Sequence, residues 1–388
     1  MPATRTLGLA ALIGFSTGIL VARVIFVGDW SLGSVYEESF SAGYSNATGC
    51  NTQPCSPCAP KLDGKSCKWK FVNYTPSAFE SRWSVRVNEN KWVGTHPCGY
   101  MNTEFVDEFR AYLDTCAVFG YCAYNDVMPA GGCDCMGSEK PKTFDSRVFS
   151  SFAYINECTQ EVVHSYIEPL AGIMRHPKFC PLPAIPEHPR VKGNRLEYIV
   201  HEQWDVHKNR NPNSRTFYFD LGASAWVSSD TNAAVMQPWF DSSFEHMCAP
   251  FQGYWAWEAT PIDPVRTFAA LPTRIVPNYH WYNVPAEPAL NSSNNPLEHI
   301  RKVATVDDYV VLKIDIDTSP VEEAFVRQLL ADKELLDLID EFYWEHHVRM
   351  HPIDFAWRSS VSKSYYPKDS LRLFAGLRKA GIRAHSWV

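Results

Sequence analysis

The C-terminal half of the chain is predicted to form an α/β domain in which helices cover a parallel sheet. Strand-like and helix-like segments alternate from about residue 191 to residue 388, which is the pattern that βαβ units produce. The segment Tyr309–Asp315 is an apolar run, as expected of a strand that is buried on both faces. Two other apolar segments each end in a carboxylate at the start of a loop. These three observations predict the fold class.

Short apolar runs mark the expected strands of this sheet. In chain order they are Thr216–Phe219, Tyr254–Trp257, His280–Val284, Tyr309–Asp315, Glu341–Glu345 and the terminal segment Gly381–Val388. Helices are expected at 233–247, where Pro238 interrupts the pattern, and at about 370–380.

The segment after Asp317 carries a signal for the start of another helix. Ser319 is placed to cap the helix, Pro320 suits its first turn, and Glu322 completes an S-x-x-E capping box. The side chains expected on the core side of this helix are Val321, Phe325 and Leu329.

The remainder of the chain divides into two parts. Residues 1–30 are expected to form a cytoplasmic tail and a membrane anchor, and residues 31–190 a cysteine-rich luminal region. Within this region, helices are expected at about 103–119 and about 146–174. The proline-rich stretch 177–189 is expected to be the linker to the C-terminal domain, 191–388.

The N-terminus has the features of a signal anchor. Leu7–Val27 is almost entirely apolar and is about as long as a helix that spans a bilayer. Arg5 precedes this segment and Asp29 follows it, so the positive-inside rule leaves the N-terminus in the cytoplasm and the rest in the lumen. A cleaved signal peptide, with Leu20–Ala22 at the cleavage site, is the alternative. The favoured topology is a single-pass type II membrane protein of the Golgi or endoplasmic reticulum.

Cysteines and glycosylation signals agree with a secretory location. The chain has 12 cysteines, and most lie between Cys50 and Cys135, which is typical of a disulfide framework formed in an oxidising compartment. N-glycosylation sequons begin at Asn46, Asn73 and Asn291.

The formal net charge of −7 indicates no basic surface for nucleic acid, so no nucleic-acid partner is expected.

The two carboxylates that end apolar segments are the main candidates for ligand binding. Asp220 lies in the motif YFDLGAS beside Gly222, and Glu258 lies in the motif WAWEATP. In a parallel α/β sheet, ligands bind where the carboxyl ends of the strands open into a crevice. Glycine lets the backbone approach a ligand closely, and an acidic side chain can accept hydrogen bonds from ribose hydroxyls. This pair, in this order, predicts a nucleoside-containing cofactor.

The order of four motifs resembles that of the FkbM-type methyltransferases. The motifs are YFDLGAS, WAWEATP, VVLKIDID followed by a capped helix, and FYWEHH. The resemblance covers residues 216 to 388 and does not extend into the cysteine-rich region. It implies a Rossmann-like fold and S-adenosylmethionine as the methyl donor.

The resemblance also implies roles for individual residues. The first cofactor loop would contain Asp220, Gly222 and Ser224. Glu258 would bind the adenosine ribose. The motif beside the reaction centre would contain Lys313, Asp315 and Asp317.

Two positions depart from the family pattern. Trp226 stands where the family has a second glycine, and Asp317-Thr318 replaces a Glu-Gly pair. A ring at position 226 could block or reshape the pocket for the methionine part of the donor. A non-catalytic luminal protein that keeps the fold is therefore one alternative.

The implied reaction is methyl transfer to a hydroxyl of a glycan or of a secreted small molecule. The hydroxyl would attack the sulfonium methyl in line, and Asp315 or His346 would remove its proton. Lys313 lies inside an apolar run, where a cation needs a partner. A structural ion pair with a neighbouring carboxylate is therefore as consistent with the sequence as a catalytic role. Asp315, Asp317 and a histidine could instead hold a divalent cation.

A metal-dependent glycosyltransferase of the Golgi is the competing enzyme class. It would use Asp315-Ile316-Asp317 as a DxD motif that holds a cation against the diphosphate of a nucleotide sugar. The predicted topology and the 13 Trp and 18 Tyr residues suit a sugar-handling enzyme. This class leaves Asp220 and Glu258 without a role, so the methyltransferase is the favoured hypothesis.

Overall fold

A computed structural model describes residues 67–89, 105, 107–108, 111, 141, 143–170, 199–224, 226, 236–350 and 358–387. Residues 49–388 group into one compact unit. The expected anchor at 1–30, most of the expected helix at 103–119 and the expected linker at 177–189 lie outside the described residues. No helix in the described ranges is long and apolar enough to cross a membrane.

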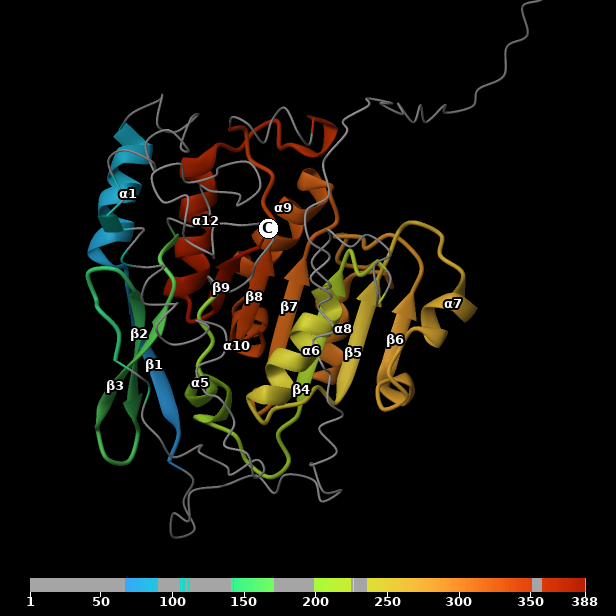
Figure 1. Cartoon of the computed structure of the whole chain (residues 1–388), viewed down its shortest axis with the longest axis horizontal. Helices are drawn as coiled ribbons and strands as arrows, with labels where there is room; N and C mark the ends of the chain where they lie inside the picture. Colours follow the sequence, from blue (N-terminus) through green and yellow to red (C-terminus); the bar gives the residue numbers. More distant parts are fainter. Residues whose placement is uncertain are drawn as a thin grey trace, which may run out of the picture. The chain divides into compact units, whose positions relative to one another are not determined.

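The centre of the structure is a six-stranded sheet in which neighbouring strands are parallel. Its strand order is β6-β5-β4-β7-β8-β9, and its arrows point the same way in Figure 1. The strands are β4 (Thr216–Leu221), β5 (Gly253–Trp257), β6 (Tyr279–Tyr282), β7 (Tyr309–Ile314), β8 (Glu341–Trp344) and β9 (Arg383–Ser386). The predicted α/β class with a parallel sheet is confirmed, and each strand overlaps its predicted segment.

The strand order reverses between β4 and β7. From β4 the chain adds β5 and β6 on one side, and it then returns to add β7, β8 and β9 on the other side. This is the order of a doubly wound sheet, in which ligands bind at the carboxyl ends of the strands where the order reverses. The sheet is therefore compatible with a Rossmann-like fold and directs attention to the ends of β4 and β7.

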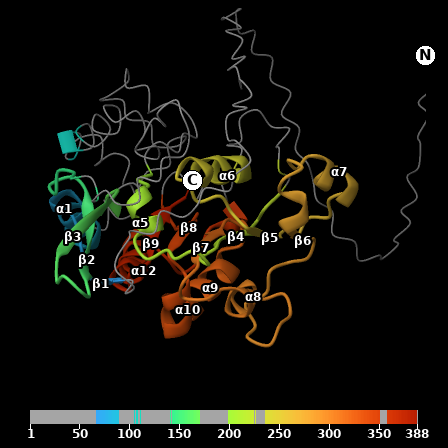
Figure 2. The same ribbon diagram turned by 90° about the horizontal axis from the view of Figure 1, so that it is seen from below.

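Helices cover both faces of this sheet. Helix α6 lies on one face, and α8, α9 and α10 lie on the other (Figure 2). Among the described residues from 199 onward, the helices are α5 (Gln203–His207), α6 (Met236–His246), α7 (Pro264–Ala269), α8 (Pro296–Val303), α9 (Ser319–Ala331), α10 (Lys333–Leu338) and α12 (Pro367–Lys379). Short 3-10 turns occur at Val276–Asn278 and Arg358–Ser360. The helices expected at 233–247 and 370–380 correspond to α6 and α12.

The main apolar core lies between the sheet and α8, α9, α10 and α12. Successive side chains of a strand point to opposite faces. The Phe and Trp residues of β4 and β5 share the face of the main core, and their Tyr residues lie on the other face. The Phe219 ring stacks on Trp255 with centroids 4.8 Å apart, and the Trp344 ring of β8 stacks on Phe374 of α12 at 5.4 Å. All four rings are buried. Burial of aromatic surface of this size is a main source of stability.

Helix α9 begins where the sequence predicts, but its capping differs from the prediction. Ser319 is the first helical residue, and Thr318 is the N-cap without a side-chain cap. The Ser319 hydroxyl donates to the carbonyl of Ser360, while Glu322 Oε1 accepts a hydrogen bond from the Ile316 N–H at 3.0 Å. The predicted capping box is therefore wrong, because a tertiary contact takes the Ser319 hydroxyl away from the helix N–H groups.

A second sheet, antiparallel and of order β1-β2-β3, lies beside α12 and β9 (Figure 1). Its strands are β1 (Trp69–Thr75), β2 (Ser150–Asn156) and β3 (Val162–Ile167). The helix predicted at about 146–174 is therefore wrong, since this segment forms the hairpin of β2 and β3. Buried and less buried residues alternate along β3, which is the two-residue period of a strand.

Helix α1 (Ala78–Glu89) follows β1 and adds to the main core. Phe79, Trp83 and Val87 recur every four residues and are buried, so they form one face of the helix. All three belong to the same apolar core as the parallel sheet.

Two features of the predicted secretory character fall within the described residues. Cys67 and Cys158 form a disulfide that joins the residues before β1 to the turn after β2. The sequon asparagines Asn73 and Asn291 are exposed. Asn46 lies outside the described residues.

Buried arginines join the small sheet to the edge of the parallel sheet. Arg378 of α12 donates to the Tyr74 hydroxyl of β1 at 3.0 Å and to the Glu168 carbonyl at 2.9 Å. Arg383 of β9 lies 2.9 Å from Asp205 Oδ2. Burial acts to lower the pKa of both guanidinium groups, but neighbouring acidic groups outweigh it and raise the pKa. These charged contacts make the two sheets parts of one unit.

Candidate functional site

Three predicted site residues form an ion-paired group at the ends of β4 and β7. Asp220 and Lys313 are partners in the register of the two strands. The Lys313 ammonium donates to Asp220 Oδ1 at 3.0 Å and lies 3.2 Å from Asp315 Oδ2. The side chains of Asp220 and Lys313 are each 1% exposed. The reversal point of the sheet is therefore occupied by a buried cation between two carboxylates.

Burial and pairing act in opposite directions on the pKa values of this group. Burial raises the pKa of the Asp220 carboxyl, and Lys313 acts to lower it. Burial also acts to lower the pKa of Lys313, but Asp220 and Asp315 outweigh it and hold this pKa well above its usual value. Lys313 is thus a cation at neutral pH that compensates the two acids. This arrangement corresponds to the ion-pair interpretation of Lys313.

Gly222 brings the loop after β4 against the end of β7. Its φ of +88° lies in the left-handed region, and a Cβ at this position would lie 1.6 Å from the carbonyl oxygen of Asp315. Glycine is the residue that avoids this collision and adopts this φ without strain. The sequence led us to expect that Gly222 lets the backbone approach a ligand. In the structure it lets one loop backbone approach another.

Glu258 follows β5 and is hydrogen bonded to the loop after β4. Its Oε2 accepts from the Ser224 N–H at 3.0 Å, and its Oε1 accepts from the Thr260 N–H at 2.6 Å. Ser224 has a φ of +44°, which is uncommon for a residue with a side chain. The Gly222 N–H donates to the Trp257 carbonyl at 3.0 Å and joins the same two loops. Glu258 is partly exposed, so its carboxylate stays accessible at the tip of β5.

The indole of Trp226 lies against aromatic residues on the α6 face of the sheet. Its ring centroid is 6.1 Å from that of Tyr254 and 6.3 Å from that of Tyr279. Trp226 is 4% exposed and belongs to the apolar cluster on this face. Tyr254 and Tyr279 occupy the first half of β5 and β6, whereas Glu258 follows the end of β5. The contacts of the Trp226 ring are therefore with the sheet face rather than with the strand tip that carries Glu258.

A second group of acids lies beside the first and includes an imidazole. Asp317, Glu345 and His347 offer ligand atoms that all lie within 4.8 Å of one another. His347 Nε2 is 3.2 Å from Glu345 Oε1, and His347 Nδ1 is 3.6 Å from Asp317 Oδ1. The His347 side chain is buried, whereas that of Asp317 is 63% exposed. Oxygen and imidazole ligands with one side open to solvent can hold a divalent cation.

The carboxyl groups in this region differ in pKa. Burial raises the pKa of Glu345 well above its usual value, and the negative charge of Asp315 adds to this effect. Burial acts in the same direction on Asp315, but Lys313 outweighs it and lowers the Asp315 pKa. Burial raises the pKa of Glu322 to about 7. The Glu345 carboxyl therefore has a higher pKa than the neighbouring Asp315 carboxyl.

The two adjacent histidines after β8 lie in different surroundings. The His346 ring stacks on Trp344 with centroids 3.8 Å apart, and its Nδ1 is 2.9 Å from Ser370 Oγ of α12. His346 is buried, and burial lowers its pKa. The prediction of His346 as the base beside Asp315 does not agree with this placement. His347, which the sequence analysis did not select, is the histidine that lies among the carboxylates.

Comparison with known proteins adds no assignment to this geometry. The chain matches no protein-family model, no curated protein and no solved structure.

Proposed function

We propose that this chain is an S-adenosylmethionine-dependent methyltransferase whose methyl donor binds at the carboxyl ends of β4 and β5. The observation that carries the proposal is the position of Glu258, a partly exposed carboxylate after β5 that accepts a hydrogen bond from Ser224 of the preceding loop. In doubly wound sheets, an acidic residue after the second strand accepts hydrogen bonds from ribose hydroxyls. The motif order that resembles the FkbM-type methyltransferases supports the same assignment.

The charge of the neighbouring strand ends favours a cationic donor. S-adenosylmethionine carries its reactive methyl on a positively charged sulfur. The carboxyl groups of Asp315, Asp317 and Glu345 lie at the ends of β7 and β8, where partial burial strengthens their attraction for a cation. A nucleotide sugar brings a negatively charged diphosphate, which these groups repel unless a metal ion lies between them.

The residues of the crevice suit methyl transfer to a hydroxyl. The donor, when bound, supplies a methyl group whose bond to sulfur breaks with the electron pair left on sulfur. An acceptor hydroxyl forms the new bond to carbon, and its proton passes to the Asp315 carboxylate, with Glu345 and His347 beside it. In-line positioning supplies much of the acceleration, and a positioned base contributes about 10²–10⁴-fold.

The proposed acceptor is a hydroxyl on a glycan or on a secreted small molecule. This part of the proposal is supported by the apolar N-terminal segment, the cysteine-rich sequence and the disulfide between Cys67 and Cys158. The exposed sequons at Asn73 and Asn291 are compatible with the same location. The proposed setting is the lumen of the Golgi or endoplasmic reticulum, with the N-terminal segment as a type II anchor.

A metal-dependent glycosyltransferase is the second candidate. The grouping of Asp317, Glu345 and His347 favours it, because these residues could hold the required cation. The DxD pair expected from the sequence is less suited to this role, since Asp315 is paired with Lys313. A cation would therefore take Glu345 and His347 together with Asp317.

Isothermal titration of the full chain separates these candidates. The proposal predicts binding of S-adenosylmethionine and S-adenosylhomocysteine, and no binding of UDP-sugars with Mn²⁺. Glu258→Ala should weaken donor binding about 10–100-fold, because hydrogen bonds to a charged group contribute about 1.5–3 kcal/mol. Glu334→Ala is the matched control, since Glu334 is 65% exposed and lies on α10, which leads into the amino end of β8.

Three outcomes contradict the proposal in different ways. Unchanged donor binding by Glu258→Ala overturns the ribose assignment. Binding of UDP-sugars with Mn²⁺ in place of the methyl donor supports the glycosyltransferase. Binding of neither ligand supports a non-catalytic protein that keeps the fold.

A further inference from the structure

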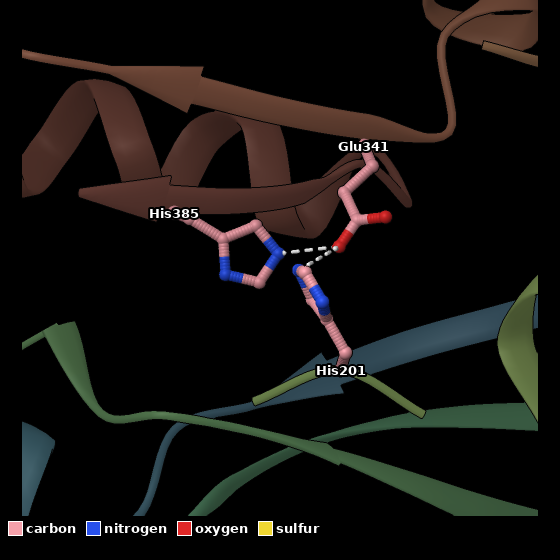
Figure 3. A group of neighbouring side chains, drawn as sticks. All are labelled: His201, Glu341 and His385. Carbon is pink, nitrogen blue, oxygen red and sulfur yellow. Dashed lines mark hydrogen bonds and ion pairs between the residues drawn. The ribbon is translucent and has the colours of Figure 1, made fainter. Parts of the chain in front are cut away.

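A buried group of two histidines and a glutamate lies at the start of β8, whereas Glu345 and His347 of the candidate site follow its end. Glu341 is the first residue of β8, His385 lies in β9, and His201 lies just before α5. Figure 3 shows the three side chains converging on one point. His385 Nε2 is 2.9 Å from Glu341 Oε1, and His201 Nε2 is 3.4 Å from the same oxygen. None of the three side chains is more than 2% exposed.

The hydrogen bonds around this group leave acceptors facing one another. His385 Nδ1 is 2.8 Å from Glu168 Oε1, so a neutral His385 carries its proton on Nδ1 and presents a lone pair on Nε2. His385 Nε2 then meets a carboxylate oxygen of Glu341. His201 Nε2 lies 3.4 Å from the same oxygen and in contact with the Tyr343 hydroxyl. The Tyr343 hydroxyl, which donates to Glu341 Oε1 at 2.9 Å, supplies a single proton. A buried set of acceptors of this kind needs a positive charge at its centre.

A zinc-type metal ion fits the identity and spacing of these groups. Two imidazoles and one carboxylate form a known zinc ligand set. Bonds of about 2.0–2.1 Å place neighbouring ligands of a tetrahedral ion about 3.3 Å apart, and the two contacts to Glu341 measure 2.9 and 3.4 Å. The three ligand atoms all lie within 4.8 Å of one another. Glu168, at Nδ1 of His385, is the outer carboxylate that commonly orients a metal-bound histidine.

A proton in place of the metal is the competing arrangement. In it, a doubly protonated His385 bridges Glu168 and Glu341, and the Tyr343 hydroxyl donates to His201. This arrangement satisfies the hydrogen bonds of His385. In it, the Tyr343 hydroxyl contacts both His201 Nε2 and Glu341 Oε1 and links the two groups. A shared metal ion would instead bond His201, His385 and Glu341 directly.

We propose that His201, Glu341 and His385 bind a zinc-type divalent metal ion with a structural role. The group is closed to solvent, and the Tyr343 hydroxyl lies beside the fourth coordination position that three protein ligands leave. The ion joins three segments that are distant in sequence, at the side of the parallel sheet that meets the small antiparallel sheet. This site is separate from the crevice, so the proposal does not depend on the proposed methyltransferase activity.

Metal analysis of the full chain tests the proposal. The protein is purified without metal-affinity steps, and its zinc content is measured by mass spectrometry. We expect stoichiometric zinc in the wild type and in His347→Ala, which disrupts the other candidate group. We expect loss of most of this zinc in Glu341→Gln and His385→Gln. A wild type without transition metal overturns the proposal, and so does zinc that is lost from His347→Ala but kept by His385→Gln.

Refolding of the wild type provides a test that does not depend on the folding of variants. The denatured chain is refolded with its disulfides intact in the presence of EDTA, Zn²⁺ or Mg²⁺. We expect Zn²⁺ to raise both the refolding yield and the thermal midpoint above their values in EDTA, and Mg²⁺ to leave both unchanged. The same result is expected for His347→Ala. Equal yields and midpoints in all three conditions overturn the proposal.

Discussion

Replacement of Lys313 by methionine should destabilise the protein strongly. The Lys313 ammonium lies 3.0 Å from Asp220 Oδ1 and 3.2 Å from Asp315 Oδ2, and its side chain is 1% exposed. Methionine is close to the alkyl chain of lysine in volume, so the substitution removes mainly the charge. The buried Asp220 carboxyl and the partly buried Asp315 carboxyl then lose their shared cation.

The expected loss is about 3–5 kcal/mol of unfolding free energy, the cost of removing one partner of a buried ion pair. Asp220→Asn, added to Lys313→Met, should restore about 1–2 kcal/mol, because a neutral amide is less costly to bury than a carboxylate. Lys333→Met is the matched control. Lys333 is 84% exposed and pairs with Asp337 at the surface, where such pairs contribute less than about 1 kcal/mol.

Denaturant unfolding of the full chain, followed by tryptophan fluorescence, measures these free energies. Circular dichroism of each variant confirms that the starting state is folded. A loss in Lys313→Met no larger than that in Lys333→Met would refute the role of Lys313 as the compensating cation. The same conclusion follows if Asp220→Asn restores no stability to Lys313→Met.

Two further predictions concern a glycine and a carboxylate outside this ion-paired group. Gly222→Ala should lower the unfolding free energy by about 2 kcal/mol or more, because its Cβ would lie 1.6 Å from the Asp315 carbonyl oxygen. The helical control Gly376→Ala, where the nearest atom is 3.4 Å away, should be neutral or stabilising; equal thermal midpoints of the two variants contradict the collision. Asp308→Asn should cost about 1–2 kcal/mol at neutral pH, since Asp308 accepts hydrogen bonds from the Arg215 guanidinium at 3.0 and 2.8 Å. Burial acts to raise the pKa of Asp308, but hydrogen bonds from Arg215 and Thr305 outweigh it and lower the pKa below its usual value. The wild type should therefore exceed Asp308→Asn in unfolding free energy by the full amount above the ordinary aspartate pKa. This difference should disappear as the pH falls through the pKa of Asp308 in the folded protein. Acid titration of both proteins checks this, and an advantage that persists at the lowest pH contradicts it.

The strands of the parallel sheet could be predicted from the sequence because each is a short apolar run. The segment 309–315 needed no tertiary information, since a strand buried on both faces is apolar at nearly every position. The hairpin at 150–167 was missed. Alternation of buried and less buried positions occurs in β3 only, since β2 is buried at nearly every position. A β-hairpin is also specified by cross-strand pairing as much as by local pattern.

The sequence also predicted that the candidate site lies at the carboxyl ends of the strands. It did not predict which side chains form ion pairs there. Asp220 and Lys313 are separated by 93 positions in sequence, and their contact depends on the register between β4 and β7. The two-residue period of a strand would have separated His346 from His347, because His346 continues the face of Trp344. The same two-residue period places Glu345 and His347 together on the opposite face, and it can be read from the sequence alone.

The contacts at His201, Glu341 and His385 could not be predicted from the sequence. These residues belong to the segment before α5 and to two strands at the far side of the sheet. Nothing in their local spacing brings them together. Only the packing of the small sheet and of the residues before α5 against β8 and β9 does so.

A crystal structure of the full chain with S-adenosylhomocysteine tests the central claim most directly. The account predicts that both ribose hydroxyls lie within hydrogen-bond distance of the Glu258 carboxylate, with the sulfur directed toward Asp315. Binding of the ligand at any other place, or a ribose that does not contact Glu258, would contradict it.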